Sequence, residues 1–494
     1  MSIPNNHELP HGLSRDSLQI IYDQGSDAVF GLVSKLYFVT VDQALTIGSL
    51  ATRVQELETR LNKDSNNSSK PPSSDGLRKK PHPKSQRQAG TKKSGGQPGH
   101  PGSTLRMSDS PKKTSNHMPP PNCTGCGGAL RDPSPLDYDR RQIFDLPPMV
   151  LEVTEHRCFH QTCPECGQVN RGAFPENVTQ PVQYGENIKA LGVYFSTAQL
   201  LPWKRTTQIL HDLFGCSLSE AVIQSVQQKC AQSLSPITQS IKQALLTKDV
   251  LHFDETGQRI EGKLHWLHVT CTRDLTYYIT HLKRGWTAMN DIGILPNYIG
   301  IAVHDAWASY SRFNCEHRSC NSHHLRELTG IAEDYGQIWA QRMKTFLLEV
   351  QASVEQAVKS GQTCLTAAQI ADFEGRYRQI LQQGHLANPK TNTSGKRGRV
   401  RQTPGRNLLL RLENRNAVLG FMDEFRVPFT NNQAEQDIRM MKVRQKVSGC
   451  FRTLEGAEDF GTIRGYLSTI KKQGHNMLDV LTSVVQGQPR APVY

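Results

Sequence analysis

Hydrophobic residues in the first part of the chain recur at the spacing of a helix. Residues 14–62 show this period, and its clearest stretch places apolar side chains three and four positions apart at Ile47, Leu50, Val54, Leu57 and Leu61. With charged residues between them, these positions form the a/d seam of about two heptads. The seam fits one amphipathic helix packed on its own domain. It also fits a short coiled coil that pairs two copies of the chain.

The next segment, residues 63–121, has no such pattern. It is rich in Ser, Pro, Gly, Lys and Asn and nearly lacks hydrophobic residues, so it cannot bury enough apolar surface to become ordered. One interpretation is a solvated linker. The other is a basic tether whose side chains, Lys79 and Lys80 among them, neutralise the phosphates of a DNA backbone.

A helical period returns over residues 184–247. Residues 201–214 predict a first helix closed by Gly215, and Ser217 with Glu220 predicts a capping box that opens a second helix. Helix, short glycine-containing turn and capped helix form the outline of a helix-turn-helix that binds DNA. Any helical hairpin has the same outline, so both interpretations remain open.

After Lys248 the period changes to that of strands. Alternating or short buried runs predict strands at residues 249–253, 264–270, 275–280 and 299–303, with Arg273 and Asp274 at a hairpin tip. Residues 325–386 then read as long, charged helices. A polar break at 387–406 carries the basic run Lys396, Arg397, Arg399 and Arg401, and helices continue from about 407 to about 485.

The charge and the cysteine content indicate which partners the protein binds and in which compartment it lies. There are 58 Lys and Arg against 45 Asp and Glu, and this excess favours polyanionic partners. The N-terminus has no signal-peptide pattern, and the longest uncharged apolar stretches are too short to span a membrane as a helix. We therefore expect the protein inside the cell. Thiols stay reduced there, so the 12 cysteines indicate metal binding or buried thiols rather than disulfides.

Four of those cysteines form a module at residues 122–172. They are arranged as two C-x-x-C knuckles, Cys123 with Cys126 and Cys163 with Cys166. Two such pairs complete a tetrahedral zinc site with four thiolate ligands, as in a zinc ribbon. A chance pattern or a redox pair is the alternative, but two pairs are hard to explain in that way. Because four thiolates leave no open coordination position, the zinc would be structural.

Two acids follow predicted strands of one sheet. Asp254 closes the strand at 249–253, and Asp305 closes the strand that ends at His304. For either acid alone, an Asp that caps a helix is the better explanation. Together they indicate a shared Mg²⁺ or Mn²⁺, because carboxylate oxygens are the hard ligands that these ions prefer.

A third acid, Glu435, lies at the start of a predicted helix. Thr430 and Gln433 form a capping box, so the helix begins there. The acid is followed by cations that are candidate DNA contacts: Arg439, Lys442, Arg444 and Lys446. By itself this pattern fits a solvent-exposed face with salt bridges. Beside two strand-end acids it favours a third metal ligand followed by a basic stripe along DNA.

The motifs together resemble the insertion sequence 66 family of transposases. HFDETG, HDAW and TNNQAEQDIR are similar to the three catalytic motifs of that family. The segments NNSSKPPSSDG, GGQPGHPG and LPWKRTTQILHDLFG and the double-knuckle module agree with it, over residues 45–485. Two departures, Gln436 in place of an Arg and Met440-Met441 in place of a Pro in the same helix, concern DNA contacts rather than metal ligands.

The resemblance implies an α+β multidomain protein of the bacterial cytoplasm, associated with the nucleoid. N-terminal helices or a coiled coil (1–62), the basic linker (63–121), the zinc ribbon (122–172) and the helix-turn-helix-like region (184–247) precede the catalytic domain. That domain (248–485) would be a ribonuclease-H-like core with a helical insertion at about 325–425. Its DDE triad would be Asp254, Asp305 and Glu435, holding two Mg²⁺ (or Mn²⁺) ions. Cys320, His323 and His324 lie in another recurrent family segment, for which packing or a DNA contact is expected rather than metal binding.

The implied activity is DNA transposition. Water cuts at the element ends, and the freed 3′-hydroxyl attacks target DNA without a covalent protein–DNA intermediate. The expected partners are double-stranded DNA, a second copy or more of the chain, and small accessory proteins of the same element. Two alternatives remain: an inactive, repurposed zinc-containing DNA-binding protein, and a zinc-ribbon nuclease acting on RNA.

Overall fold

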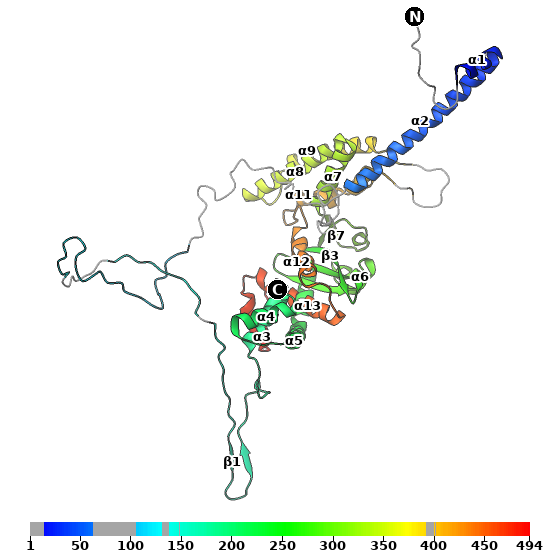
Figure 1. Cartoon of the computed structure of the whole chain (residues 1–494). Coiled ribbons are helices and arrows are strands. Elements are labelled where there is room, and N and C mark those ends of the chain that lie inside the picture. The colour runs from blue at the N-terminus through cyan, green and yellow to red at the C-terminus, as the bar shows by residue number, and fades with distance from the viewer. Residues whose placement is uncertain (1–13, 63–104, 131–137, 148, 392–399, 401) are drawn as a thin grey trace. The chain divides into compact units, whose positions relative to one another are not determined.

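The computed structural model describes residues 14–62, 105–130, 138–147, 149–391, 400 and 402–494 (Figure 1). Several predicted DNA contacts lie outside these residues: Lys79, Lys80, Lys396, Arg397, Arg399 and Arg401. Most of the predicted linker does so too. The described residues form two compact units, a core unit that lies within residues 83–302, 308–316 and 432–494 and a helical unit that lies within residues 1–82, 303–307 and 317–431.

Two helices form the described N-terminal region. Helix α1 (Arg15–Asp23) is capped by Ser14, whose hydroxyl accepts a hydrogen bond from the Ser17 amide, and α2 spans Ser26–Asn62. The predicted helical period is thus confirmed, and its seam is exposed, with Ile47 at 67% and Leu61 at 78%. Contrary to the expectation from sequence, the span Ser26–Ala51 is long and apolar enough to cross a membrane by length and composition alone.

The cysteine module contains a small hairpin. Strands β1 (His160–Thr162) and β2 (Val169–Arg171) pair antiparallel and carry the Cys163–Cys166 knuckle in the turn between them. An isolated bridge between Asn122 and Ala129 flanks the other knuckle in the same way. A hairpin that carries a knuckle fits the zinc ribbon that the sequence predicts.

The sheet of the protein has the strand order β5-β4-β3-β6-β7. Its first three strands, β3 (Val250–Ile260), β4 (Lys263–Cys271) and β5 (Thr276–His281), form an antiparallel meander. The predicted turn at Arg273 and Asp274 joins β4 to β5, and there the Thr272 hydroxyl accepts hydrogen bonds from the Asp274 and Leu275 amides.

Strand β3 is longer than predicted, so Asp254 does not close it. The strand continues for six residues past Asp254 and turns at Glu261 and Gly262, both at positive φ. The second half of the strand is polar, so the pattern of apolar residues predicted only its first half. The polar side chains find partners inside the sheet; Gln258, for example, is 1% exposed and donates to the Thr280 hydroxyl at 2.8 Å.

A crossover leads from β5 to β6 (Ile301–His304) through helix α6 (Trp286–Ile292) and the short helix η3 (Leu295–Asn297). The Ile301 amide donates to the Asp249 carbonyl at 2.8 Å. Both β3 and β6 begin at this bond, so the two strands run in the same direction and Ile301 is the register partner of Val250. The short helix η4 (Tyr310–Arg312) then precedes β7 (Glu316–Ser319).

Helices cover the sheet of the core unit. Helix α12 (Asn432–Ser448) packs its apolar face, Ala434, Ile438 and Met441, in one cluster with Leu267 and Val269 of β4, as its sequence pattern predicts. A second cluster joins α3 (Glu186–Val193), α5 (Glu220–Leu246), α13 (Leu454–Lys472) and α14 (Met477–Val485). The predicted helix-turn-helix region therefore shares a hydrophobic core with the C-terminal helices.

The helical pair of that region forms as predicted, with one local difference. A π-helix (η2, Tyr194–Ala198) leads to α4 (Trp203–Phe214), which ends at Gly215 in the left-handed conformation. Helix α5 is capped by Ser219, whose hydroxyl accepts from the Val222 amide; the predicted cap, Ser217, is two residues earlier.

The helical unit is built from helices in the position of the predicted insertion: α7 (Asn321–Tyr335), α8 (Ile338–Lys359), α9 (Ala367–Ala387), α10 (Pro404–Leu412) and α11 (Arg415–Asp423). Figure 1 shows α8 and α9 side by side. Phe346 of α8 packs on Phe373 and Tyr377 of α9, and the buried Tyr377 hydroxyl donates to the Leu412 carbonyl at 2.6 Å.

A buried ion pair ties α12 to α13. Lys472 Nζ lies 2.6 Å from Asp437 Oδ2, the two side chains are 13% and 10% exposed, and the ammonium also donates to the Thr276 hydroxyl. Lys472→Met leaves the Asp437 carboxylate uncompensated, and we expect a loss of about 3–5 kcal/mol in stability, measured by urea unfolding.

Lys471→Met, at the exposed neighbouring position, is the matched control and should change stability by less than about 0.5 kcal/mol. Equal effects of the two substitutions would contradict a stabilising role for the pair.

Candidate active site

Strand β3 carries two neighbouring acids with different surroundings. Asp254 is half-buried, and its Oδ1 accepts the Glu255 amide at 2.8 Å. Glu255 is buried, with Oε1 bound to Arg284 Nε at 2.8 Å and Oε2 bound to the Tyr310 hydroxyl at 2.5 Å. Burial raises the pKa of Glu255, and Arg284 partly offsets this. Glu255 thus links β3 to the segments after β5 and β6, whereas Asp254 lies at the accessible side.

Asp305 directly follows β6, as predicted. Its Oδ1 accepts the Trp307 amide at 3.1 Å, and Ala306 between them has a positive φ of 48°, so the chain turns sharply at the acid. Before it, His304 is buried with its Nε2 2.9 Å from His317 Nδ1, and burial lowers the pKa of His304 to about 3. The buried, neutral His304 therefore supports the end of the strand through its hydrogen bond with His317.

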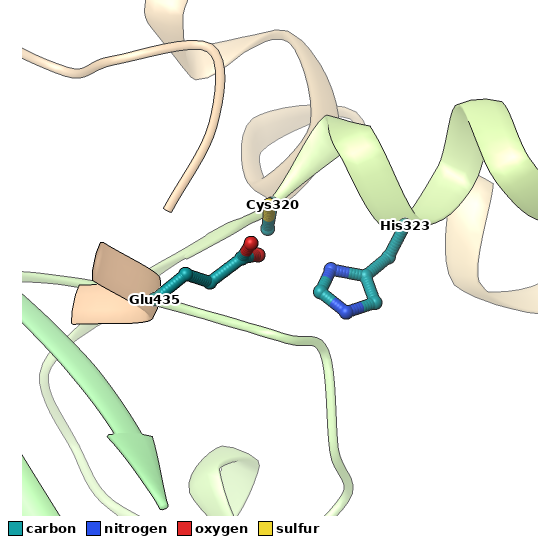
Figure 2. Close-up of side chains that lie close together, drawn as sticks. All are labelled: Cys320, His323 and Glu435. Atoms are coloured by element: carbon teal, nitrogen blue, oxygen red, sulfur yellow. The ribbon is translucent and has the colours of Figure 1, made fainter. Parts of the chain in front are cut away.

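Glu435 lies in the first turn of α12, which begins at Asn432 rather than directly after the predicted cap Thr430. The preceding residue, Asn431, is buried and donates its amide to Cys320 Sγ at 3.1 Å. One donor atom of each of Cys320, His323 and Glu435 lies within 4.8 Å of the others (Figure 2). The sequence indicated no such grouping, although the C-x-x-H spacing at a helix start was a signal that could have found it.

The predicted basic stripe divides into two pairs. Arg439 and Lys446 are exposed. Lys442 is half-buried, which lowers its pKa, and donates to the Gly257 carbonyl at 3.1 Å. Arg444 lies over the Phe451 ring, with its Cζ 3.4 Å from the centroid, and burial lowers its pKa to about 10. Lys442 and Arg444 thus contribute to packing of α12, and Arg439 and Lys446 face solvent.

Each C-x-x-C knuckle is formed locally. The Gly127 amide donates to the Cys123 carbonyl and the Gly167 amide to the Cys163 carbonyl, both at 2.9 Å, with both glycines at positive φ. Backbone hydrogen bonds, first from the Cys126 amide and the Cys166 amide, lower the pKa of Cys123 and of Cys163. These turns and acidified thiols fit zinc. Within the described residues, however, the two knuckles do not meet as one four-sulfur group.

Comparison with known families agrees with these features. Residues 181–459, more than half of the chain, match the model described as Transposase IS66 family. Residues 120–167 match the zinc-finger binding domain of transposase IS66, and residues 32–106 match a family of unknown function. No curated protein matches the chain.

The matched residues include all three predicted acids and both knuckles as far as Cys166. Transposase, DNA binding and zinc are the properties that these families carry. The chain belongs to the IS66 family of transposases.

Proposed function

We propose that the chain cuts DNA at the ends of its element and joins the freed 3′-hydroxyl to target DNA, with Asp254, Asp305 and Glu435 as ligands of two divalent cations. The observation that carries this proposal is the register of β3 and β6. Val250 and Ile301 are partners, and each acid lies four residues further along, at positions 254 and 305. Paired residues in parallel strands project to the same face, so this register favours a shared site for the two carboxylates.

The strand order supports a ribonuclease-H-like core for this unit. An antiparallel meander of three strands is extended, on the β3 side, by β6 after a helical crossover. The first two acids then come from the central strand and its parallel neighbour, and the third from a helix after the insertion. Three hard carboxylates fit Mg²⁺ or Mn²⁺, which lower the pKa of the attacking hydroxyl and stabilise the leaving oxygen when bound.

The chain's own residues orient the substrate and the ligands. Glu255 binds Arg284 and Tyr310 and so holds β3 against the segments that follow β5 and β6. These contacts fix the position of Asp254, the preceding residue of the strand. Arg439 and Lys446, both exposed on the helix of Glu435, are suited to bind backbone phosphates. We infer no nucleophilic side chain, because water and then a DNA hydroxyl attack in turn.

Pairing of two DNA ends requires two copies of the chain, and α2 is the segment that we propose joins them. Its seam residues, such as Leu50 at 58% and Val54 at 52% exposed, cover one side of the helix at heptad spacing. Dependence on accessory proteins of the same element is a further part of this proposal.

The rates of cutting and joining should each fall at least about a thousandfold in Asp254→Asn, Asp305→Asn and Glu435→Gln. Each substitution removes the charge of one metal ligand, and the three ligands act jointly in catalysis. Labelled element ends with Mg²⁺ or Mn²⁺ measure both steps, and a mobility shift measures DNA binding, which should persist. Asp249→Asn, at an exposed acid just before β3, is the matched control. Cutting at the normal rate by the Asp254→Asn protein would refute the assignment.

Arg439→Gln and Lys446→Gln should each weaken binding to DNA of any sequence. Each should also reduce the slope of log affinity against log salt concentration by about one, because one phosphate contact is lost. Arg444→Gln should instead reduce thermal stability and leave the salt slope unchanged, because its guanidinium stacks on Phe451. An Arg444→Gln protein with the smaller slope and normal stability would place that side chain on DNA.

Replacing Cys123 or Cys163 with Ser should release about one zinc ion per chain, measured by metal analysis. The helices of the core unit should keep their circular dichroism, because their hydrophobic clusters contain no knuckle residue. Cys364→Ser, at an exposed cysteine outside the module, should retain the zinc. Full zinc content in both knuckle variants would argue against a four-thiolate site.

A further inference from the structure

The segment between β5 and α6 presents large apolar side chains beside a cation. Leu282 is 60% exposed, and Trp286, the first residue of α6, is 42% exposed. Lys283 lies between them and is also exposed. The helix is anchored by other residues, because Met289 and Ile292 are buried. An exposed tryptophan that its own helix does not need for packing leaves a large apolar surface in water, which indicates a binding function.

Hydrogen bonds hold this segment on the sheet. The Lys283 amide donates to His281 Nδ1 at 3.0 Å, and His268 Nε2 lies 3.3 Å from the Lys283 carbonyl. Burial lowers the pKa of His268 to about 4, so its ring is neutral and Nε2 is the nitrogen that donates. The Arg284 guanidinium lies over the Trp266 ring, with Cζ 4.9 Å from the centroid. A partner would therefore bind a segment that is already held in place, which lowers the entropic cost of binding.

One buried carboxylate joins this segment to a second one. Glu255 binds Arg284 through Oε1 and the Tyr310 hydroxyl through Oε2. Tyr310 begins the short helix η4, which ends at Arg312, and the Arg312 guanidinium lies over the Trp286 ring with Cζ 6.0 Å from the centroid. All of these residues belong to the core unit. Both segments are thus tied to β3, one residue after the first predicted metal ligand.

This combination of an indole and cations suits an unpaired nucleotide. Arg312 and Lys283 are exposed, and such cations bind phosphate oxygens. An indole stacks on any base, because every base has a π-face. Inside a duplex each base is stacked on both sides, so a protein ring reaches a base only at a strand end or where the base has left its pair. Trp286 beside these cations therefore favours DNA with unpaired nucleotides over continuous duplex.

We propose that Lys283, Trp286 and Arg312, here called the stacking surface, bind an unpaired nucleotide at the DNA end on which the chain acts. Trp286 stacks on the base, and the two cations bind adjoining phosphates. The inference rests on the proposed function, because cutting at Asp254 leaves a free strand end. Through Glu255 the stacking surface is tied to the strand that carries Asp254, so the cut end is retained on the same element of the protein.

Binding of two DNA probes by the full-length protein tests the proposal. One probe is a blunt element end, and the other is the same duplex with a short single-stranded tail; fluorescence anisotropy without Mg²⁺ measures binding while no strand is cut. The wild type should bind the tailed probe at least about fivefold more tightly, and Trp286→Ala should lose this preference. Trp286→Phe should keep most of it, because a ring remains to stack.

The control for Trp286→Ala is Tyr494→Ala, at an aromatic residue of the core unit with a similar exposed fraction of 47%. It should keep the preference for the tailed probe. Equal affinities of the wild type for the two probes would overturn the proposal. So would an equal loss of affinity for both probes in Trp286→Ala, because a purely structural role would weaken binding to each.

Salt dependence tests the cations of the stacking surface separately. Lys283→Gln and Arg312→Gln should each reduce the slope of log affinity against log salt concentration by about one for the tailed probe. Lys471→Gln, at another exposed lysine of the core unit, should leave that slope unchanged. Unchanged slopes in both stacking-surface variants would contradict the phosphate contacts.

The catalytic assignment can fail independently of the stacking surface. Asp254→Asn, which should not cut, should still prefer the tailed probe as the wild type does. Cutting by Asp254→Asn would refute the proposed function, whatever the two probes show. Loss of cutting in Asp254→Asn together with equal binding of both probes by the wild type would refute only the stacking surface.

Discussion

The main-chain pairing of β3 is the constraint on which the other groups depend. The strand pairs with β4 from His252 to Ile260, and the Ile301 amide fixes the start of β6 against it. A one-residue slip would turn Asp254 to the opposite face and expose Glu255, whose carboxylate is buried against Arg284 and Tyr310. The buried acid therefore fixes the register that its neighbour requires, because moving Glu255 away from its two partners would leave a charge in the core.

Sequence alone was sufficient for features set by local chemistry. The turn at Asp274, the glycine that ends α4 and the apolar face of α12 each follow from the preferences of a few adjacent residues, and each is present. The same holds for the knuckles, whose turns depend on Gly127 and Gly167. These features need no knowledge of distant partners.

The remainder depends on contacts between distant segments. The second half of β3 is polar, and only the meander that buries Gln258 against Thr280 makes it a strand. Arg444 has the appearance of a DNA contact until Phe451, from the loop before α13, is placed under it. Cys320 is separated from Asn431 by more than a hundred positions, so no periodicity links them. In each case a tertiary partner decides between packing and function.

The knuckles and the start of α7 show two ways in which a cysteine sulfur meets a backbone amide. In each knuckle the amides of the turn itself acidify the first cysteine, so the pair is ready before its counterpart arrives, and zinc can supply the free energy that joins the two. At Cys320, by contrast, the amide that donates to the sulfur comes from residue 431, more than a hundred positions away, so this contact forms only when distant segments of the chain have folded together.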